Sequence, residues 1–289
     1  MTAATTFALS PYTNIDRLIA SVLESDLPDY KSCVLALERS IKDYFPALSP
    51  KTSPILNSIP HWRPAQIGFV IVEYSVFTNA AIHMFLDARI RNHWEKLDAE
   101  IVRNVEEEMG VLTKRVPHLE LMRFGHRYDL GLETDGVEPS PSTKGFVERM
   151  NKLFRSDDNA FLGGCLLAFE ATAVDEFRIV DKFLRAYKSA TGGEIRKGSL
   201  TDIYIAGHVT HDDNDPEADH YAGMRNAIGE YIDAANLPRF IRGFYAVTMN
   251  LSMWWEHLAI EAHHRMIEER LVLKDPQRFD PFRVFAEAS

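Results

Sequence analysis

The densest group of possible metal ligands in the chain lies past its middle, between His208 and His220. These thirteen residues hold three histidines and five acids. Imidazole nitrogens combined with carboxylate oxygens suit iron or manganese, and neither a helix nor a loop requires so many of them. The segment therefore predicts a metal site, and the simpler alternative is an acidic surface loop that binds calcium.

Spacing alone does not decide which residues of this segment bind the metal. His208 and Asp212 are four residues apart and would share one face of a helix. Pro216 interrupts such a helix, because proline lacks a backbone donor and disfavours the helical conformation of the residue before it. The competing ligands are His211, Asp215 and Glu217. Glu217 and His220 also have the Glu-x-x-His spacing of carboxylate-bridged di-iron bundles.

Two earlier segments offer ligands of the same kind. Glu107 and His118 are eleven residues apart, which places them about 20° from eclipsed if their helices are nearly collinear. Glu170 stands within an apolar run, where an isolated charge costs several kcal/mol unless it is paired or bound to a metal. The alternatives are a solvated acidic helix end with a surface histidine, and a glutamate at the edge of its helix.

A further histidine and glutamate cluster occurs near the C-terminus, where His257, Glu261 and His264 share one helix face. Together with Glu217 and His220 it would suggest a ferritin-like di-metal bundle. That fold takes its ligands from four long helices, and the interval between His220 and Glu261 is too short to supply the missing one. Polar packing around the two adjacent tryptophans is the favoured interpretation of this cluster.

These residues must be positioned by helices, because apolar residues recur every three or four positions while period-2 alternation is scarce. The predicted class is all-α. The predicted helices cover residues 15–27, 30–45, 66–88, 89–109, 117–130, 161–187, 200–225, 226–235 and 238–271, with a connector over 46–64 and a loop over 133–143. We expect a single domain over 1–289, with its core at about 65–271 and N-terminal helices and the connector over 1–64.

The composition narrows the class of partner. A net charge of -10 argues against nucleic acid and against an anionic membrane surface, because either would be approached against a repulsive field. Cys33 and Cys165 lie in unlike settings, which indicates neither a disulfide framework nor a thiolate metal site. The first residues lack the features of a signal peptide, and no apolar run has the length of a membrane span. We therefore expect a cytoplasmic protein with a small-molecule substrate.

The order of the motifs resembles the heme-oxygenase-like di-iron oxidases and oxygenases, a family of seven-helix bundles. That family has an Asn-x-x-Glu-Glu-x-Gly helix end, present here from Asn104 to Gly110, then a histidine, a lone glutamate in the next core helix, and a His-x-x-x-Asp motif with a later histidine. The resemblance covers about residues 65–260. Two spacings depart from the pattern: Glu107 to His118 is eleven where about seven is common, and Asp212 to His220 is eight where three is usual.

The resemblance implies a seven-helix bundle with an extra N-terminal helix, two Fe(II) ions and O2 as cosubstrate. The implied iron ligands and catalytic residues are Glu107, His118, Glu170, His208, Asp212 and His220. The favoured reaction is N-oxygenation of a small amine or amino acid, and the alternative is oxidative C-C cleavage or desaturation of an amino or fatty acid. An external electron donor and a homodimer are compatible with this assignment.

Two other classes of function stay open at this point. A cofactorless or thiaminase-like enzyme on the same bundle would use a nucleophilic cysteine, for which Cys165 is the nearest to Glu170. A non-catalytic heme-oxygenase-like protein would not need buried acids.

Overall fold

The computed structural model describes residues 15–23, 29–112, 116–209 and 216–274, and these residues are helical without a strand. The α-helices are α1 (Ile15–Leu23), α2 (Tyr30–Tyr44), α3 (Pro54–Ser58), α4 (Pro64–Arg91), α5 (Glu95–Glu108), α6 (His118–Phe124), α7 (Pro141–Phe154), α8 (Asn159–Ala190), α9 (Leu200–His208), α10 (Pro216–Gly229) and α11 (Leu237–Lys274). Two 3-10 turns (Pro46–Leu48 and Ile59–His61) and one π-helical turn (Gly125–Leu130) complete the elements. The predicted all-α class is confirmed, whereas the seven-helix arrangement stays a prediction.

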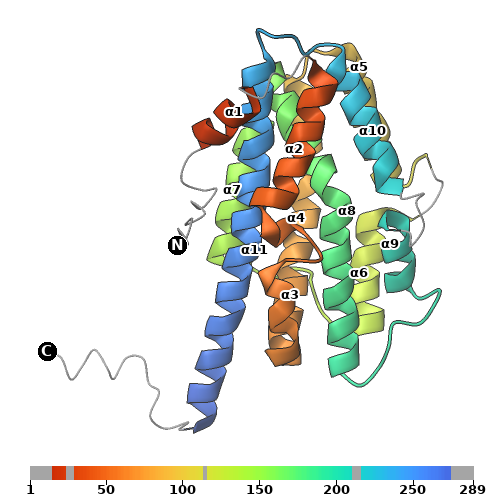
Figure 1. Cartoon of the computed structure of the whole chain (residues 1–289). Helices are drawn as coiled ribbons and strands as arrows, with labels where there is room; N and C mark the ends of the chain where they lie inside the picture. Colours follow the sequence, from red (N-terminus) through yellow and green to blue (C-terminus); the bar gives the residue numbers. More distant parts are fainter. Residues whose placement is uncertain (1–14, 24–28, 113–115, 210–215, 275–289) are drawn as a thin grey trace, which may run out of the picture.

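The two longest helices, α8 and α11, form the centre of the bundle, and α4 and α7 pack against them (Figure 1). Glycines allow the backbones of α8 and α11 to touch. A Cβ atom on Gly164 would lie 2.0 Å from the carbonyl oxygen of Phe240, and one on Gly243 would lie 1.9 Å from that of Phe161. Any larger residue at either position would therefore force the two helices apart.

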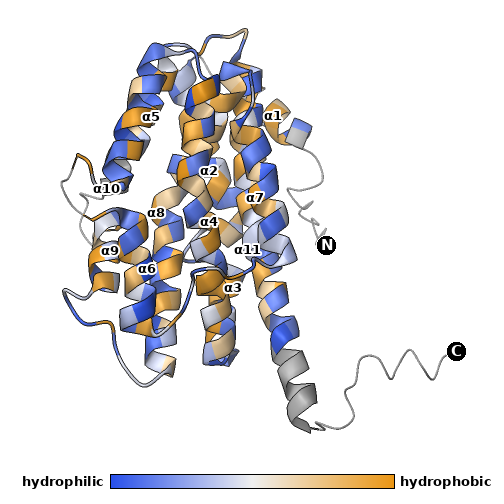
Figure 2. Cartoon of the chain, turned by 180° about the vertical axis from the view of Figure 1, so that it is seen from behind, coloured by the Kyte–Doolittle hydropathy of each residue, from blue (hydrophilic) through white to orange (hydrophobic). Residues whose placement is uncertain are grey.

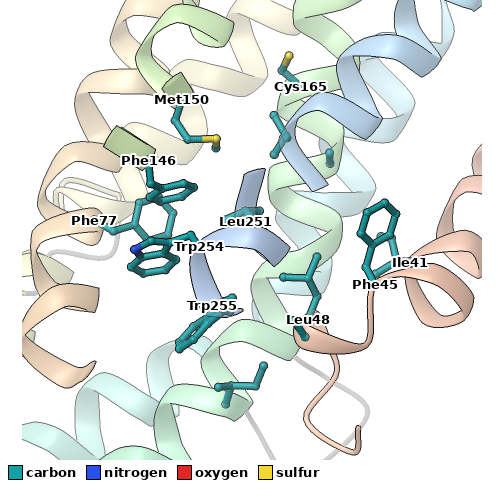
Figure 3. Close-up of a cluster of buried hydrophobic side chains, with 14 of the residues drawn as sticks. Ile41, Phe45, Leu48, Phe77, Phe146, Met150, Cys165, Leu251, Trp254 and Trp255 are labelled. Carbon is teal, nitrogen blue, oxygen red and sulfur yellow. The ribbon is translucent and has the colours of Figure 1, made fainter. Parts of the chain in front are cut away.

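Aromatic side chains fill the space between α4, α7 and α11 (Figure 3). The rings of Phe146 and Trp254 stack with centroids 4.6 Å apart, and Phe77 meets Trp254 edge to face at 5.2 Å. The indole N–H of Trp254 donates to the hydroxyl of Thr143 at 3.0 Å, so this buried ring leaves no polar atom unpaired. These contacts fix α11 against α4 and α7.

Helix α4 is apolar almost all round, as predicted for a central buried helix. By length and composition it would also pass as a membrane span, but half of that apolar window is buried inside the bundle. The outer helices, such as α5, mix hydrophilic and hydrophobic residues (Figure 2). The core position of α4 accounts for its composition.

The predicted helix over 89–109 is wrong at its start. Helix α4 continues to Arg91 and α5 begins at Glu95. Between them, the side chain of Asn92 bonds both backbone groups of Trp94, accepting from its N–H at 3.1 Å and donating to its carbonyl at 2.9 Å. These local bonds replace the helical ones and turn the chain. The turn lets α5 run back along the bundle toward the site.

The cluster in the last helix does not gather into a site. His257 and His264 are exposed, and Glu261 accepts a hydrogen bond from Ser142 at 2.6 Å. The two indole N–H groups of Trp254 and Trp255 bond residues of α7 and α8 instead. These contacts do not support the prediction that the cluster packs around the tryptophans. The hydrogen bond of Glu261 instead connects α11 to the start of α7.

Candidate metal centre

The first ligand group joins three helix ends that lie together on one flank of α8 (Figure 1). Glu108 is the last residue of α5, His118 the first of α6 and His208 the last of α9. His118 Nδ1 lies 3.1 Å from Glu108 Oε1, and His208 Nε2 lies 3.9 Å from the same oxygen. One ligand atom from each residue falls within 4.8 Å of the others, so the group can hold a metal ion.

The geometry of this first group fits a transition metal. Metal–nitrogen and metal–oxygen bonds of about 2.0–2.2 Å place two ligands of one ion at most about 4.4 Å apart, so the three residues need to close by only a few tenths of an ångström. His208 Nδ1 lies 2.7 Å from the carbonyl oxygen of Tyr204. With its proton on Nδ1 the ring donates to this carbonyl, and the lone pair that could bind a metal is then on Nε2.

Burial also favours the metal-binding form of His208. The side chain is enclosed and its ring stacks on Phe177, with centroids 3.9 Å apart. Burial lowers the pKa of His208 to about 4, against a smaller opposing effect of the nearby Glu108 carboxylate. The imidazole is therefore neutral near pH 7, as a metal ligand must be.

A second ligand group lies beside the first and is organised by Asn104. The Asn104 amide nitrogen lies 2.8 Å from Glu170 Oε1, to which it donates, and 3.1 Å from His220 Nδ1. His220 Nε2 lies 3.0 Å from Glu107 Oε2. An amide donor at Nδ1 requires the histidine proton on Nε2, which then donates to Glu107. Two carboxylates and one imidazole thus lie around one side chain of α5.

The carboxyl groups of the two ligand groups differ in charge. Burial raises the pKa of Glu170 to about 7, and the charge of Glu108 raises it further while His220 and Asn104 oppose the shift. Burial would also raise the pKa of Glu108, but the hydrogen bond from His118 and the charges of the surrounding histidines hold it below its ordinary value. A cation bound between them would favour the ionised form of both carboxyl groups.

Glu170 lies between an inner cavity and an outer cleft. The inner one is a cavity of about 80 Å³ that also reaches Asn104, Glu108, His208 and His220, and its remaining wall is largely apolar: Tyr74, Phe77, Phe85, Phe169 and Phe177 are among its residues. The outer one is a cleft of about 350 Å³ between α2, α8 and α10, lined in part by Glu38, Lys42, Asp175, Arg178 and Tyr221. Members of both ligand groups therefore face a small and largely apolar cavity, and Glu170 also reaches the charged cleft.

The structure brings most of the predicted ligands together. His118 and His208 meet in the first group, and Glu107, Glu170 and His220 meet in the second. Asp212 and its alternatives His211 and Asp215 lie outside the described residues, so their roles stay predictions. Glu217 lies at the start of α10, and its role stays a prediction as well.

Sequence reasoning missed three residues of the site, of which Glu108 belongs to the first ligand group. Glu108 was passed over because the spacing argument treated 89–109 and 117–130 as collinear, whereas the helix ends at Glu108 and the next begins at His118. Asn104 belongs to the Asn-x-x-Glu-Glu-x-Gly motif and could have been found there. Glu176 follows Asp175 directly, and the pair looks like a solvated face, yet Glu176 is buried and lines the inner cavity.

Comparison with known proteins places the chain in a family. A family model described as a domain of unknown function with a solved structure, DUF3865, matches residues 32–261, and the chain belongs to that family. Two crystal structures of a CADD-like protein of unknown function from Nostoc punctiforme, at 2.00 and 1.35 Å resolution, share the fold with TM-scores of 0.71 and 0.69. Both are 23% identical and match 85% of this chain and 99% and 96% of theirs. No curated protein matches it.

Proposed function

We propose that this member of the DUF3865 family is an O2-dependent non-heme di-iron oxygenase that acts on a small amine or amino acid. The observation that carries the proposal is the pair of adjacent ligand groups, each with imidazole and carboxylate donors, that face one small apolar cavity. The mixed nitrogen and oxygen donors suit iron. The resemblance of the motifs to the heme-oxygenase-like oxygenases, and the all-helical fold, support the same assignment.

The residues divide naturally between two ions. Glu108, His118 and His208 would hold one. Glu107 and His220 would hold the other, and binding there would displace the proton that His220 Nε2 donates to Glu107. Glu170 would complete the second group, and its place beside both groups suits a carboxylate shared between the ions. Three carboxylates against two ferrous ions leave a charge of about +1, and Asp212 remains a proposed further ligand. When bound, the iron pair supplies the electrons that reduce O2.

The protein's own contribution is orientation and exclusion of water. The carbonyl of Tyr204 fixes the tautomer of His208, and Asn104 holds Glu170 and His220 in register. The wall of aromatic rings keeps the cavity apolar, which strengthens every charge interaction inside it. N-oxygenation is the favoured reaction, and oxidative C-C cleavage or desaturation is the second candidate because the wall also suits a hydrocarbon chain.

The cysteine-based alternative has less support. Cys165 is fully buried, its thiol hydrogen-bonds the carbonyl of Gly243 at 3.5 Å, and burial raises its pKa well above the ordinary value. The thiolate is the nucleophilic form, so such a thiol is unreactive. Cys165 does not line the inner cavity either. A non-catalytic protein would leave the buried Glu170 unexplained.

Iron stoichiometry tests the proposal. Protein loaded with Fe(II) without oxygen should bind about two irons per chain, and Glu108→Ala and His220→Ala should each weaken binding at their own site. Asp175→Asn is the control, because it removes a carboxylate of α8 that lines the outer cleft and belongs to neither ligand group. Titration with Co(II), read from its visible absorption, would count the sites independently.

The outcomes separate the alternatives clearly. Loss of one site in each ligand variant with both retained in Asp175→Asn would support the two-ion assignment. Protein that binds no iron, or binds it unchanged in both ligand variants, would contradict it. Oxygen uptake by the loaded protein, screened first with small amines and amino acids and then with fatty acids, would identify the reaction.

A further inference from the structure

A third buried acid, Glu176, faces the inner cavity without belonging to either ligand group. Its side chain is 5% exposed and lines the cavity wall on α8. Six residues separate it from Glu170, which turns it about 120° away around the helix. Among the described residues its hydrogen bond is to Trp255, whereas Glu107, Glu108 and Glu170 each bond a histidine or Asn104 of the ligand groups. Metal binding therefore does not explain why this carboxyl group is buried.

Few described groups of the protein can stabilise a negative charge on Glu176. Among the described residues its hydrogen-bond partner is the indole N–H of Trp255, at 3.4 Å, whereas a carboxylate can accept about four hydrogen bonds. Of the residues that the structure describes, no lysine or arginine lines the cavity. Satisfying the Trp255 indole would need only a neutral acceptor. An ionisable group that is buried with one weak donor is costly unless a partner comes from outside.

The surroundings of Glu176 define what such a partner must be. Tyr74, Phe77, Phe169 and Phe177 contribute aromatic rings to the same cavity. Aromatic faces attract cations, and they also pack well against aliphatic carbon. A cavity of about 80 Å³ is small, since an apolar cavity of about 150 Å³ holds benzene. The partner is therefore a compact cation with a short carbon chain.

We propose that the carboxylate of Glu176 binds the ammonium group of a short aliphatic amine inside the inner cavity, with the aromatic rings around its carbon chain. The inference rests on the proposed function, because it identifies the substrate class of that same site. A nitrogen held by Glu176 is protonated and has no free lone pair to oxidise. The reacting atom is therefore at the other end of the molecule, a second nitrogen or a carbon that faces the histidine and glutamate groups.

Binding to metal-free protein tests this inference without any activity. The probes are n-butylamine and 1,4-diaminobutane, compared with n-butanol and butyrate, which match the first in size but carry no positive charge. Saturation-transfer NMR titrations give a dissociation constant for each. We expect the amines to bind about tenfold or more tightly than n-butanol, and Glu176→Gln to lose that advantage, because a charged hydrogen bond is worth that factor. Asp175→Asn should bind like the wild type.

Several results would overturn the inference: no amine binding by the wild type, equal binding of n-butanol, or amine binding by Glu176→Gln within twofold of the wild type. Circular dichroism and the melting temperature of each variant show whether it is folded. Iron stoichiometry measured on the same samples keeps the two proposals apart. If the protein binds amines through Glu176 but takes up no iron, the inference stands and the oxygenase proposal is refuted. If it binds two irons but no amine, the oxygenase proposal stands and the inference is refuted.

Discussion

The exchange Glu176→Gln should make the protein more stable at neutral and alkaline pH. Burial raises the pKa of Glu176 to about 8, from an ordinary value of 4.5. In the unfolded chain this carboxyl group loses its proton near pH 4.5, whereas in the folded chain it keeps the proton until about pH 8. The folded state thus binds more protons between these values. Stability therefore falls as the pH rises through this window, and it stays at the lower level above it.

The size of the effect follows from the two pKa values. Each unit of difference corresponds to about 1.36 kcal/mol, so the interval from 4.5 to about 8 gives an upper value of about 5 kcal/mol. Water that enters the adjoining cavity would reduce this, and we expect about 2 to 5 kcal/mol. Glutamine keeps the acceptor for the Trp255 indole, so at pH 5 the variant and wild type should agree within about 1 kcal/mol.

Urea unfolding of metal-free protein from pH 5 to pH 9, followed by tryptophan fluorescence, gives the free energy of unfolding at each pH. The quantity of interest is the variant value minus the wild-type value, since the other titrating groups cancel in that difference. Asp175→Asn is the control, because its carboxylate pairs with Arg178 at the surface and should change stability by less than about 1 kcal/mol at every pH.

One pattern would refute the reasoning. If the difference between Glu176→Gln and the wild type stays flat from pH 5 to pH 9, the carboxyl group is solvated or already paired when it is ionised. If the wild type instead gains on the variant as the pH rises, a cationic partner within the protein stabilises the carboxylate. Either result would also remove the reason to expect a cationic ligand in the cavity.

Three further predictions concern the rest of the fold. Burial lowers the pKa of His126 to about 4, below the unfolded value of about 6.5, so the protein should lose stability as the pH falls from 6.5 to 4. His126→Gln should reduce this loss by up to about 3 kcal/mol in the same unfolding assay. Gly164→Ala should destabilise the protein by at least about 1–3 kcal/mol in thermal unfolding, whereas Gly145→Ala, whose neighbour is a mobile arginine end, should not. Cys33 and Cys165 are fully buried, so a thiol reagent such as DTNB should react with neither until urea unfolds the chain.

Sequence periodicity predicts the helices best where one helix face or the whole helix is buried. The apolar residues of α4 and α8 repeat over many turns, and both helices extend only a few residues beyond the predicted ranges. Periodicity does not predict where polar side chains bond the backbone. After α4 the side chain of Asn92 turns the chain by two hydrogen bonds to the backbone of Trp94. At the start of α7 the side chain of Ser140 caps the helix by accepting from the N–H of Thr143. Such bonds involve single residues and leave no repeating pattern.

The site shows the same limit. The residue types and their order led to His118, Glu170, His208 and His220. The structure places these side chains in two neighbouring groups, and their binding of a metal stays a prediction. The choice between Glu107 and Glu108 depends on the path of the chain between α5 and α6. Helix α5 ends at Glu108 and α6 begins at His118, so the 100° step per residue of one continuous helix does not relate them. In the structure the two neighbouring acids contact different histidines, so the candidate site includes both.

The three acids that line the inner cavity differ in how the protein neutralises them. Glu108 has histidine partners that hold its pKa low, so it carries its charge before any metal binds. Glu170 has an amide donor and a histidine nearby, which leaves its pKa at about 7, and a bound cation would complete its ionisation. Glu176 accepts from the indole of Trp255, and the described residues that line the cavity include no lysine or arginine. Environments that separate like groups in this way commonly mark separate roles. This criterion supports the proposal that Glu108 and Glu170 bind metal and that Glu176 binds a cation that enters the cavity.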